Sequence, residues 1–322
     1  MGQVEEVRKR WIDERPTFEE FAQVLKDRLN QLMKRAGVWF DVSARAKTLD
    51  SFVKKLLKEN SQYTYDTISD KVGARVVVRY ISELDLVIDV VQGGLALGAV
   101  ENKLATLGPE RFGYLSIHVD RVSLRAGDPE YEHFPPQRFF AELQVRTLAQ
   151  HLWSEMSHDT AYKTVGESIP PEMRRRVNLM AGQIEVADRE FDRIGRESRQ
   201  TREGQALAIL EPHYYRLSTR RPDGELTIEI LRKLLPSLEL PADYLTPGGT
   251  LDGFLASQHA ELAAAYDHAA TDDEPSLVHQ PEALLIYERL MHDQLGFRRL
   301  WNQHFPEKEL ERLGLFFGLS FE

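Results

Sequence analysis

The sequence contains no cysteine, and this absence excludes disulfide bonds, thiolate metal sites and a cysteine nucleophile. It also contains no apolar run that approaches the ~18 residues of a membrane-spanning helix. Residues 1–6 lack the charged and apolar segments of a signal peptide. We therefore expect a cytoplasmic protein that has no membrane partner.

The charge of the chain is unevenly distributed. With 322 residues, 42% hydrophobic and 29% charged, the chain is an ordinary globular sequence long enough for two domains. Residues 205–322 hold 19 acidic and 10 basic residues, whereas residues 1–204 hold 32 and 31. We predict a near-neutral domain at 1–204 and an acidic helical domain at 205–322 with a regulatory or partner-binding role. This acidity argues against direct nucleic-acid binding by the second domain.

The stretch 138–145 is predicted to be a strand around which the first domain is organised. Polar and apolar residues alternate from residue 142 onward, so the two sets point to opposite faces. The polar face holds Glu142, Gln144 and Arg146, and the apolar face holds Leu143 and Val145. An alternative interpretation is an edge strand whose polar face is solvated.

This strand leads directly into a predicted helix at 148–163. Thr147 fits a helix N-cap, and Gln150 lies three residues further on as its capping-box partner. Helix N-termini that follow strands often bind phosphate in α/β proteins. We therefore expect an anion at this junction.

Cations gather around a second junction, between a predicted strand at 39–47 and a short helix at 48–58. They are Arg45, Lys47, Lys54 and Lys55, accompanied by Ser51. This density of positive charge suits a polyphosphate. A surface helix with solvated lysines is the alternative.

Asp70 precedes the apolar run 76–78, which is typical of a buried central strand. A carboxylate there, followed by Gly73, suits a metal ligand at a point of close approach. An aspartate that only stabilises a turn is the alternative.

The loop 101–112 leads into a predicted strand at 113–119, which pairs with the strand at 138–145 as a long-looped hairpin at 114–146. Tyr114, Ser116 and His118 share one face of this strand. A tyrosine on a polar face offers a surface on which a base can stack.

The remaining chain is predicted to be helical. In the first domain, helices are expected at 4–36, with a start at Thr17 after Pro16, at 82–97, capped by Ser82, and at 171–202. On the helix 148–163, His151, Glu155, His158 and Tyr162 form one stripe. The spacing departs from known zinc motifs, which favours a stripe that supports the neighbouring strand over a zinc site. The acidic domain should contain helices near 226–236, 250–268, 279–302 and 307–316. The predicted fold class is α/β (α+β), a mixed sheet flanked by helices, followed by an all-helical C-terminal domain.

Five motifs in order resemble the synthetase domain of RelA/SpoT-type alarmone synthetases over roughly residues 20–200. They are Arg45-x-Lys47-x3-Ser51-x3-Lys55, Asp70-x2-Gly73-x-Arg75, Gly113-Tyr114-x-Ser116-x-His118, Glu142-x-Gln144-x-Arg146-Thr147 and His158-x3-Tyr162-Lys163. No upstream hydrolase region is evident, so the chain is similar to the small, synthetase-only members. The resemblance implies Mg²⁺-dependent transfer of pyrophosphate from ATP to the ribose 3′-hydroxyl of GDP or GTP, giving AMP and (p)ppGpp.

The resemblance also implies roles for individual residues. Asp70 and Glu142 would hold Mg²⁺, and together with Arg45 and Gln144 they form the implied catalytic set. The implied ATP-binding residues are Arg45, Lys47, Ser51, Lys55 and Arg75. The implied acceptor-binding residues are Tyr114, Ser116, His118 and Arg146.

The chain departs from the family pattern in the segment that faces the acceptor. Residues 101–105 and 109–112 replace the Lys-Asp-Tyr-Ile and Pro-Lys-x-Asn segments of many members. The sequence therefore leaves two acceptors open. One is a guanine nucleotide. The other is the 3′ end of tRNA, as in toxin-type relatives, in which case the C-terminal domain would restrain the activity. A weakly catalytic sensor module is a further alternative.

Overall fold

The computed structural model describes residues 2–57, 64–103, 116–162, 170–268 and 276–321. The chain forms two compact units. Unit 1 comprises Met1–Met33 and Phe40–Asp192, and unit 2 comprises Lys34–Trp39 and Arg193–Glu322. The boundary predicted from charge, at 204, lies within the helix α7 (Arg202–Leu217) of unit 2.

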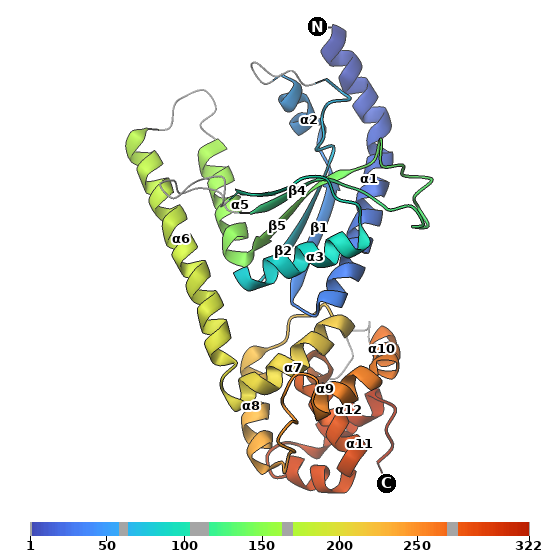
Figure 1. The fold of residues 1–322 in the computed structure, drawn as a ribbon, viewed down its shortest axis with the longest axis vertical. Helices are drawn as coiled ribbons and strands as arrows, with labels where there is room; N and C mark the ends of the chain where they lie inside the picture. Colours follow the sequence, from blue (N-terminus) through green and yellow to red (C-terminus); the bar gives the residue numbers. More distant parts are fainter. Residues whose placement is uncertain (1, 58–63, 104–115, 163–169, 269–275, 322) are drawn as a thin grey trace. The chain divides into compact units, whose positions relative to one another are not determined.

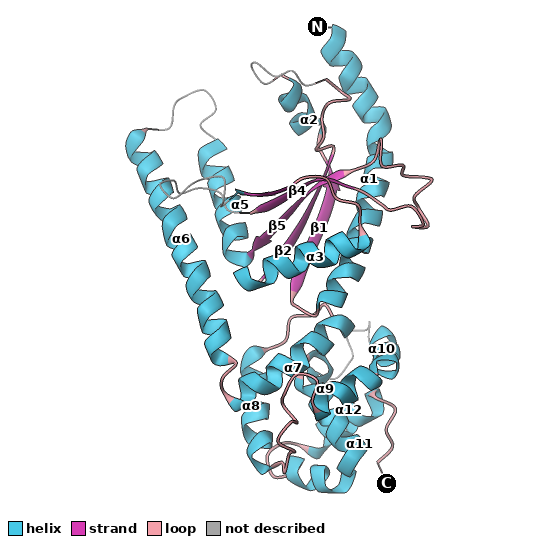
Figure 2. Cartoon of the chain, in the orientation of Figure 1, coloured by secondary structure: helices cyan, strands magenta, loops and turns pink. Residues whose placement is uncertain are grey.

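Unit 1 contains a mixed five-stranded sheet (Figure 2). Its strands are β1 (Phe40–Ala46), β2 (Val72–Val78), β3 (Val100–Asn102), β4 (Ile117–Val122) and β5 (Ala141–Thr147), in the order β1-β2-β5-β4-β3. Strands β2 and β5 are parallel, and the other neighbouring pairs are antiparallel. The predicted mixed sheet and the β4–β5 hairpin are confirmed. The edge-strand alternative is wrong, because β5 lies between β2 and β4.

The helices of unit 1 are α1 (Gly2–Ala36), α2 (Leu49–Leu56), α3 (Leu84–Gly94), α5 (Leu148–Tyr162) and α6 (Pro171–Ser198), and a short 3-10 turn, η1 (Ile81–Glu83), precedes α3. The last turns of α1 and α6, after Met33 and Asp192, belong to unit 2. The predicted start of α1 at Thr17 is wrong, because the helix continues through Pro16. Trp11 and Phe18, on either side of this proline, are both buried and lie 5.3 Å apart between ring centroids. This packing offsets the backbone hydrogen bond that proline removes.

The predicted cap of the helix after β2 is also wrong. Ser82 donates its backbone N–H and its hydroxyl to Asp192 of α6, at 3.1 and 2.6 Å, instead of capping α3. Glu83 accepts the backbone N–H groups of Arg79 and Tyr80, each at 3.0 Å. A buried carboxylate from a distant helix therefore replaces the local cap.

The two faces of the sheet are covered differently (Figure 1). Alternate residues such as Val76, Val119 and Leu143 are fully buried, as expected for the apolar face. Helix α3 packs against β5, and Leu32 of α1 lies against Gly94 of α3. Helix α5 reaches Arg75 on the polar face of β2. The site described below lies on this polar face.

The regular secondary structure in the described residues of unit 2 is helical, as predicted. Its helices are α7 (Arg202–Leu217), α8 (Gly224–Leu234), α9 (Thr250–Ser257), α10 (His259–His268), α11 (Glu282–Trp301) and α12 (Glu307–Phe316). The predicted helix at 250–268 is interrupted at Gln258, and α7 was not predicted. The helices enclose a core of their own that includes Tyr214, Leu231 and Trp301. No helix in the described part of the chain is long and apolar enough to cross a membrane.

Candidate active site on the polar face of the sheet

One row of residues crosses all five strands on the polar face. Strand pairing aligns them in the order Ser43, Arg75, Gln144, His118 and Glu101. Three of these residues were predicted as site residues from three separate motifs. The register of the sheet therefore brings together side chains that are far apart in sequence.

A hydrogen-bonded chain runs along β5 and across to β4. Arg146 donates to the Gln144 side-chain oxygen, and the Gln144 amide donates to Glu142 at 3.4 Å. His118 Nδ1 lies 2.7 Å from the same Glu142 oxygen. The hydrogen bond from His118 lowers the pKa of Glu142 below its usual value against the opposing effect of burial. Glu142 is therefore an ionised carboxylate at neutral pH.

The predicted cation cluster surrounds Asp70. Lys47 Nζ lies 2.5 Å from one Asp70 oxygen, and Lys55 Nζ lies 2.8 Å from the other. Burial of Asp70 acts to raise its pKa, but the two lysine contacts outweigh burial and hold the pKa below its usual value. Glu142 interacts electrostatically with Asp70, so the two acidic groups belong to one site. The alternative of an aspartate that only stabilises a turn does not account for these contacts.

Arg45 and Gly73 extend this cluster across the sheet. Arg45 pairs in register with Gly73, which in turn pairs with Glu142. A side chain built at Gly73 would meet no atom within 4 Å among the described residues. Arg45 is exposed and forms no ion pair within the described part of the chain. The surface above Gly73 is therefore open and bordered by a cation and a carboxylate.

Helix α5 supplies a second set of contacts to the polar face. Arg75 Nη1 lies 2.7 Å from Glu155 and 3.2 Å from His151 Nδ1. Burial and the charges of Arg75 and Arg146 lower the pKa of His151. His151 and Glu155 thus support the strand that carries Arg75, as the stripe predicted. The side chains of His158 and Tyr162 lie outside the described residues.

The capping box at the start of α5 is confirmed. The Thr147 N–H donates to the Gln150 side chain at 3.2 Å, and the Gln150 N–H donates to the Thr147 hydroxyl at 3.1 Å. A carboxylate of the protein lies at this junction, where Asp188 of α6 accepts from Thr147 at 2.8 Å and from Gln150 at 3.2 Å. These contacts involve the side chains of Thr147 and Gln150, and the phosphate site at this helix end stays a prediction. Glu142 lies at the beginning of β5, away from that end.

Several residues were missed or are differently placed. Ser51 takes part in the start of α2, where its N–H donates to the Thr48 hydroxyl at 3.3 Å. Ser116 is buried. Tyr114 lies outside the described residues, so its predicted role stays a prediction. Sequence reasoning missed Asp188 and Asp192, whose spacing of four residues on α6 was the available signal.

Asp70 and Glu142 are the candidate metal ligands. No group of three or more histidine, aspartate or glutamate side chains in the described part of the chain is arranged to hold a metal ion. Two carboxylates nevertheless fit Mg²⁺, which binds through one or two carboxylates together with substrate phosphates and keeps several waters. The donor set is therefore compatible with a Mg²⁺ ion that arrives with a nucleotide.

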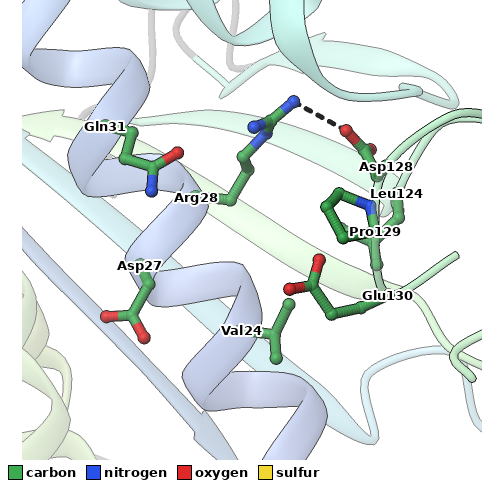
Figure 3. Close-up of a pocket in the computed structure, with 8 residues that line it drawn as sticks. All are labelled: Val24, Asp27, Arg28, Gln31, Leu124, Asp128, Pro129 and Glu130. Atoms are coloured by element: carbon green, nitrogen blue, oxygen red, sulfur yellow. Dashed lines mark hydrogen bonds and ion pairs between the residues drawn. The ribbon is translucent and has the colours of Figure 1, made fainter.

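A cavity of about 300 Å³ lies elsewhere, between α1 and residues 124–130 (Figure 3). Arg28 crosses it to pair with Asp128 at 2.6 Å. None of the predicted site residues lines this cavity. We therefore assign the candidate site to the open polar face.

Comparison with known proteins supports the resemblance found in the motifs. Residues 44–167 match the family model described as "Region found in RelA / SpoT proteins". GTP pyrophosphokinase YwaC of Bacillus subtilis (strain 168) is 26% identical over 136 residues, which cover 40% of this chain and 61% of YwaC. GTP pyrophosphokinase YjbM of the same organism is 23% identical over 155 residues, which cover 48% of this chain and 70% of YjbM.

Solved structures similar to this chain include two synthetases from Bacillus subtilis. The match to small alarmone synthetase 1 has a TM-score of 0.47 at 18% identity. It covers 60% of this chain and 100% of the synthetase chain. The match to small alarmone synthetase 2 has a TM-score of 0.46 at 21% identity. It covers 58% of this chain and 98% of the synthetase chain. The region matched by the family model includes all the site residues predicted from the motifs.

Proposed function

We propose that this chain, whose residues 44–167 carry the region found in RelA/SpoT proteins, transfers pyrophosphate from ATP to the ribose 3′-hydroxyl of GDP or GTP. The products would be AMP and (p)ppGpp. The observation that carries the proposal is the grouping of Lys47 and Lys55 around Asp70, which is coupled electrostatically to Glu142. Phosphoryl-type transfer needs positioned cations and metal-binding carboxylates more than covalent chemistry.

The cations of the site would bind the donor. In the free protein the Lys47 and Lys55 ammonium groups neutralise Asp70. On ATP binding they would turn to the phosphate oxygens, which frees Asp70 to act with Glu142 as a metal ligand. Arg45 is exposed beside the open surface over Gly73 and would bind the same polyphosphate. A Mg²⁺ ion held there would offset the negative charge of the polyphosphate, including the charge that develops on the departing AMP.

The reaction balances through one bond formed and one broken. The acceptor 3′-oxygen forms a bond to the β-phosphorus of ATP, while the bond from that phosphorus to the oxygen shared with the α-phosphate breaks. AMP leaves with that oxygen. The hydroxyl proton passes to Glu142. The hydrogen bond from His118 keeps this carboxylate ionised.

The acceptor is the point that the experiment must decide. Purified protein is incubated with Mg²⁺ and ATP labelled on the γ-phosphate, with GDP, GTP, ADP and bulk tRNA offered separately. Transfer of label to a guanine nucleotide, abolished by Glu142→Gln, is the expected result. Label found only on tRNA would replace the nucleotide acceptor by the toxin-type reaction. Absence of transfer to all four acceptors would contradict a pyrophosphotransferase and leave the sensor alternative.

A further inference from the structure

The segment between Tyr65 and Lys71 carries Asp70 into the site, and its two ends are fastened to α1. The inference drawn from this arrangement rests on the proposed function, because it concerns the ATP-binding part of the same site. Among the described residues, Asp70 lies at ion-pair distance from Lys47 and Lys55. The position of Asp70 therefore also depends on the contacts that Tyr65 and Lys71 make with α1.

The first end is held by Tyr65. Its hydroxyl donates to Glu14 of α1 at 2.6 Å, and the residue is 4% exposed. Glu14 is fixed in turn by Arg10 at 3.0 Å and by Arg138 at 3.2 Å. Burial acts to raise the pKa of Glu14, but the contacts from Tyr65 and Arg10 hold it below its usual value. The Tyr65 hydrogen bond is therefore made to an ionised acceptor, the stronger class of hydrogen bond.

The second end is held by Lys71, which is 9% exposed. Its ammonium lies 4.5 Å from the ring centroid of Tyr65 and 5.7 Å from that of Phe18. Lys71 therefore lies against α1, whereas its neighbour Asp70 lies against Lys47 and Lys55. The Lys71 carbonyl also accepts the Lys47 N–H at 2.8 Å. The same residue therefore links α1 to the strand that carries one of the cations.

The helix that carries Lys55 rests on the same part of α1. Phe52 of α2 stacks on Trp11 with ring centroids 4.4 Å apart and planes 5° apart. Tyr65 completes this aromatic cluster, 5.6 Å from Phe52 and 6.5 Å from Trp11. Residues 10–18 of α1 thus contact both elements whose side chains meet at Asp70. Buried aromatic pairs of this kind contribute about 0.5–1.5 kcal/mol each beyond the area they bury, so the cluster stabilises the packing of these elements on α1.

We propose that Tyr65, held by Glu14, is a positioning residue for ATP binding: it fixes the Asp70 segment against α1, so that Asp70, Lys47 and Lys55 are preorganised for a Mg²⁺–polyphosphate. Tyr65 touches no substrate in this scheme. Its effect is transmitted through the short segment to Asp70 and through Phe52 to α2. In this scheme the acceptor half of the site, around His118 and Arg146, does not depend on it.

The test compares two tyrosine hydroxyls of the full-length protein. Tyr65→Phe removes the hydrogen bond to Glu14 and keeps the ring. Tyr266→Phe is the matched control. It removes a buried hydroxyl in unit 2 that donates a hydrogen bond to the Val278 carbonyl at 2.8 Å. Binding of Mg²⁺ with a non-hydrolysable ATP analogue is measured by calorimetry, together with KM for ATP, KM for the acceptor and the melting temperature.

We expect Tyr65→Phe to weaken analogue binding about three- to tenfold, with a matching rise in KM for ATP and no change in KM for the acceptor. Tyr266→Phe should lower the melting temperature comparably and leave ATP affinity unchanged. Glu14→Gln retains an acceptor for Tyr65 and should preserve most of the affinity, whereas Glu14→Leu should not. In the Glu14→Leu background, Tyr65→Phe should then have no further effect.

Native analogue affinity in Tyr65→Phe, or an equal loss in Tyr266→Phe, would overturn the inference, because either result would reduce the role of Tyr65 to general stability. The proposed function fails in a different way, by absence of label transfer from the unmutated protein. The binding measurement separates the two because it requires no acceptor and no chemical step.

Discussion

Arg45 and Glu142 lie at the same level of the sheet on either side of Gly73, each paired in register with that glycine from a neighbouring strand. The positive and negative side chains therefore border a patch of backbone that carries no side chain of its own. An added Cβ at Gly73 would meet no described atom within 4 Å. Packing among the described residues gives no reason for glycine at this position, and we infer that the open surface accommodates the substrate.

Gly73→Ala is therefore expected to fold normally and to lose activity. Alanine in a strand interior is about 0.5–1 kcal/mol more favourable than glycine, so the melting temperature should stay equal or rise. The new methyl group occupies the surface between Arg45 and Glu142, where the polyphosphate would lie. Label transfer from ATP should fall at least about tenfold, since a tenfold loss corresponds to only about 1.4 kcal/mol.

Gly93→Ala provides the control for this substitution. Gly93 lies in α3, also with no described atom within 4 Å of an added Cβ, and outside the site. It should gain stability and keep native transfer activity. Native activity in Gly73→Ala as well would show that the open surface is not used by the substrate.

Lys55→Met tests the cations around Asp70. The substitution keeps the length of the side chain and removes the ammonium that lies 2.8 Å from Asp70. Charge-assisted hydrogen bonds contribute about 1.5–3 kcal/mol, so KM for ATP should rise about tenfold or more, with a smaller change in KM for the acceptor. Lys54→Met, on the exposed side of the same helix, should change neither value by more than about twofold. Equal effects of the two substitutions would indicate a general change of surface charge.

The local parts of this site could be predicted from the sequence. A period of two placed Glu142, Gln144 and Arg146 on one face of β5, and the Thr147–Gln150 capping box spans only three residues. Both features depend on neighbours in the chain, so local pattern was sufficient.

The contacts that join distant segments could not be predicted in the same way. Asp188 meets Thr147 across 41 residues, and Glu14 meets Tyr65 across 51. No local period records which helix will supply a buried carboxylate, so the sequence pattern did not reveal Asp188 beside Thr147. The continuity of α1 through Pro16 likewise depends on the burial of Trp11 and Phe18 in the folded unit.

His118 is expected to set the acid limb of the pH–rate profile through Glu142. The hydrogen bond from His118 is the main cause of the lowered pKa of Glu142, and burial acts against it. His118→Phe removes the donor and leaves the burial, so the pKa of Glu142 should rise. Because the reaction needs the ionised carboxylate, the pH below which kcat/KM declines should move upward.

His118→Gln retains a donor near Glu142 and should keep the acid limb closer to that of the native protein. The measurement is kcat/KM for label transfer from pH 4 to pH 9 at a fixed Mg²⁺ concentration, because the pKa of Glu142 lies below its usual value. A reduced rate with an unmoved acid limb in His118→Phe would show that Glu142 does not control this limb.

Asp188→Asn is expected to stabilise unit 1 at neutral pH. Burial raises the pKa of Asp188 to about 6, so the folded state favours its protonated form. A raised folded-state pKa gives stability that is fully present below the ordinary pKa near 4 and is lost as pH rises through about 6. The hydrogen bonds from Thr147 and Gln150 both go to the same oxygen, Oδ2, so an asparagine carbonyl in that place can accept both. The substitution therefore removes the cost of a buried charge and keeps the contacts.

The gain should be about 1–3 kcal/mol at pH 7, since each pKa unit corresponds to about 1.36 kcal/mol, and it should shrink toward pH 4. Urea unfolding of the full-length protein at pH 4.5, 6 and 7.5 measures it, with Glu190→Gln, an exposed carboxylate on the same helix, as control. Asp188 connects α6 to Thr147, the last residue of β5, which directly follows Arg146. A variant that is less stable than the native protein at every pH would show that the second carboxylate oxygen, which Asn replaces by an amide, has an essential acceptor role there.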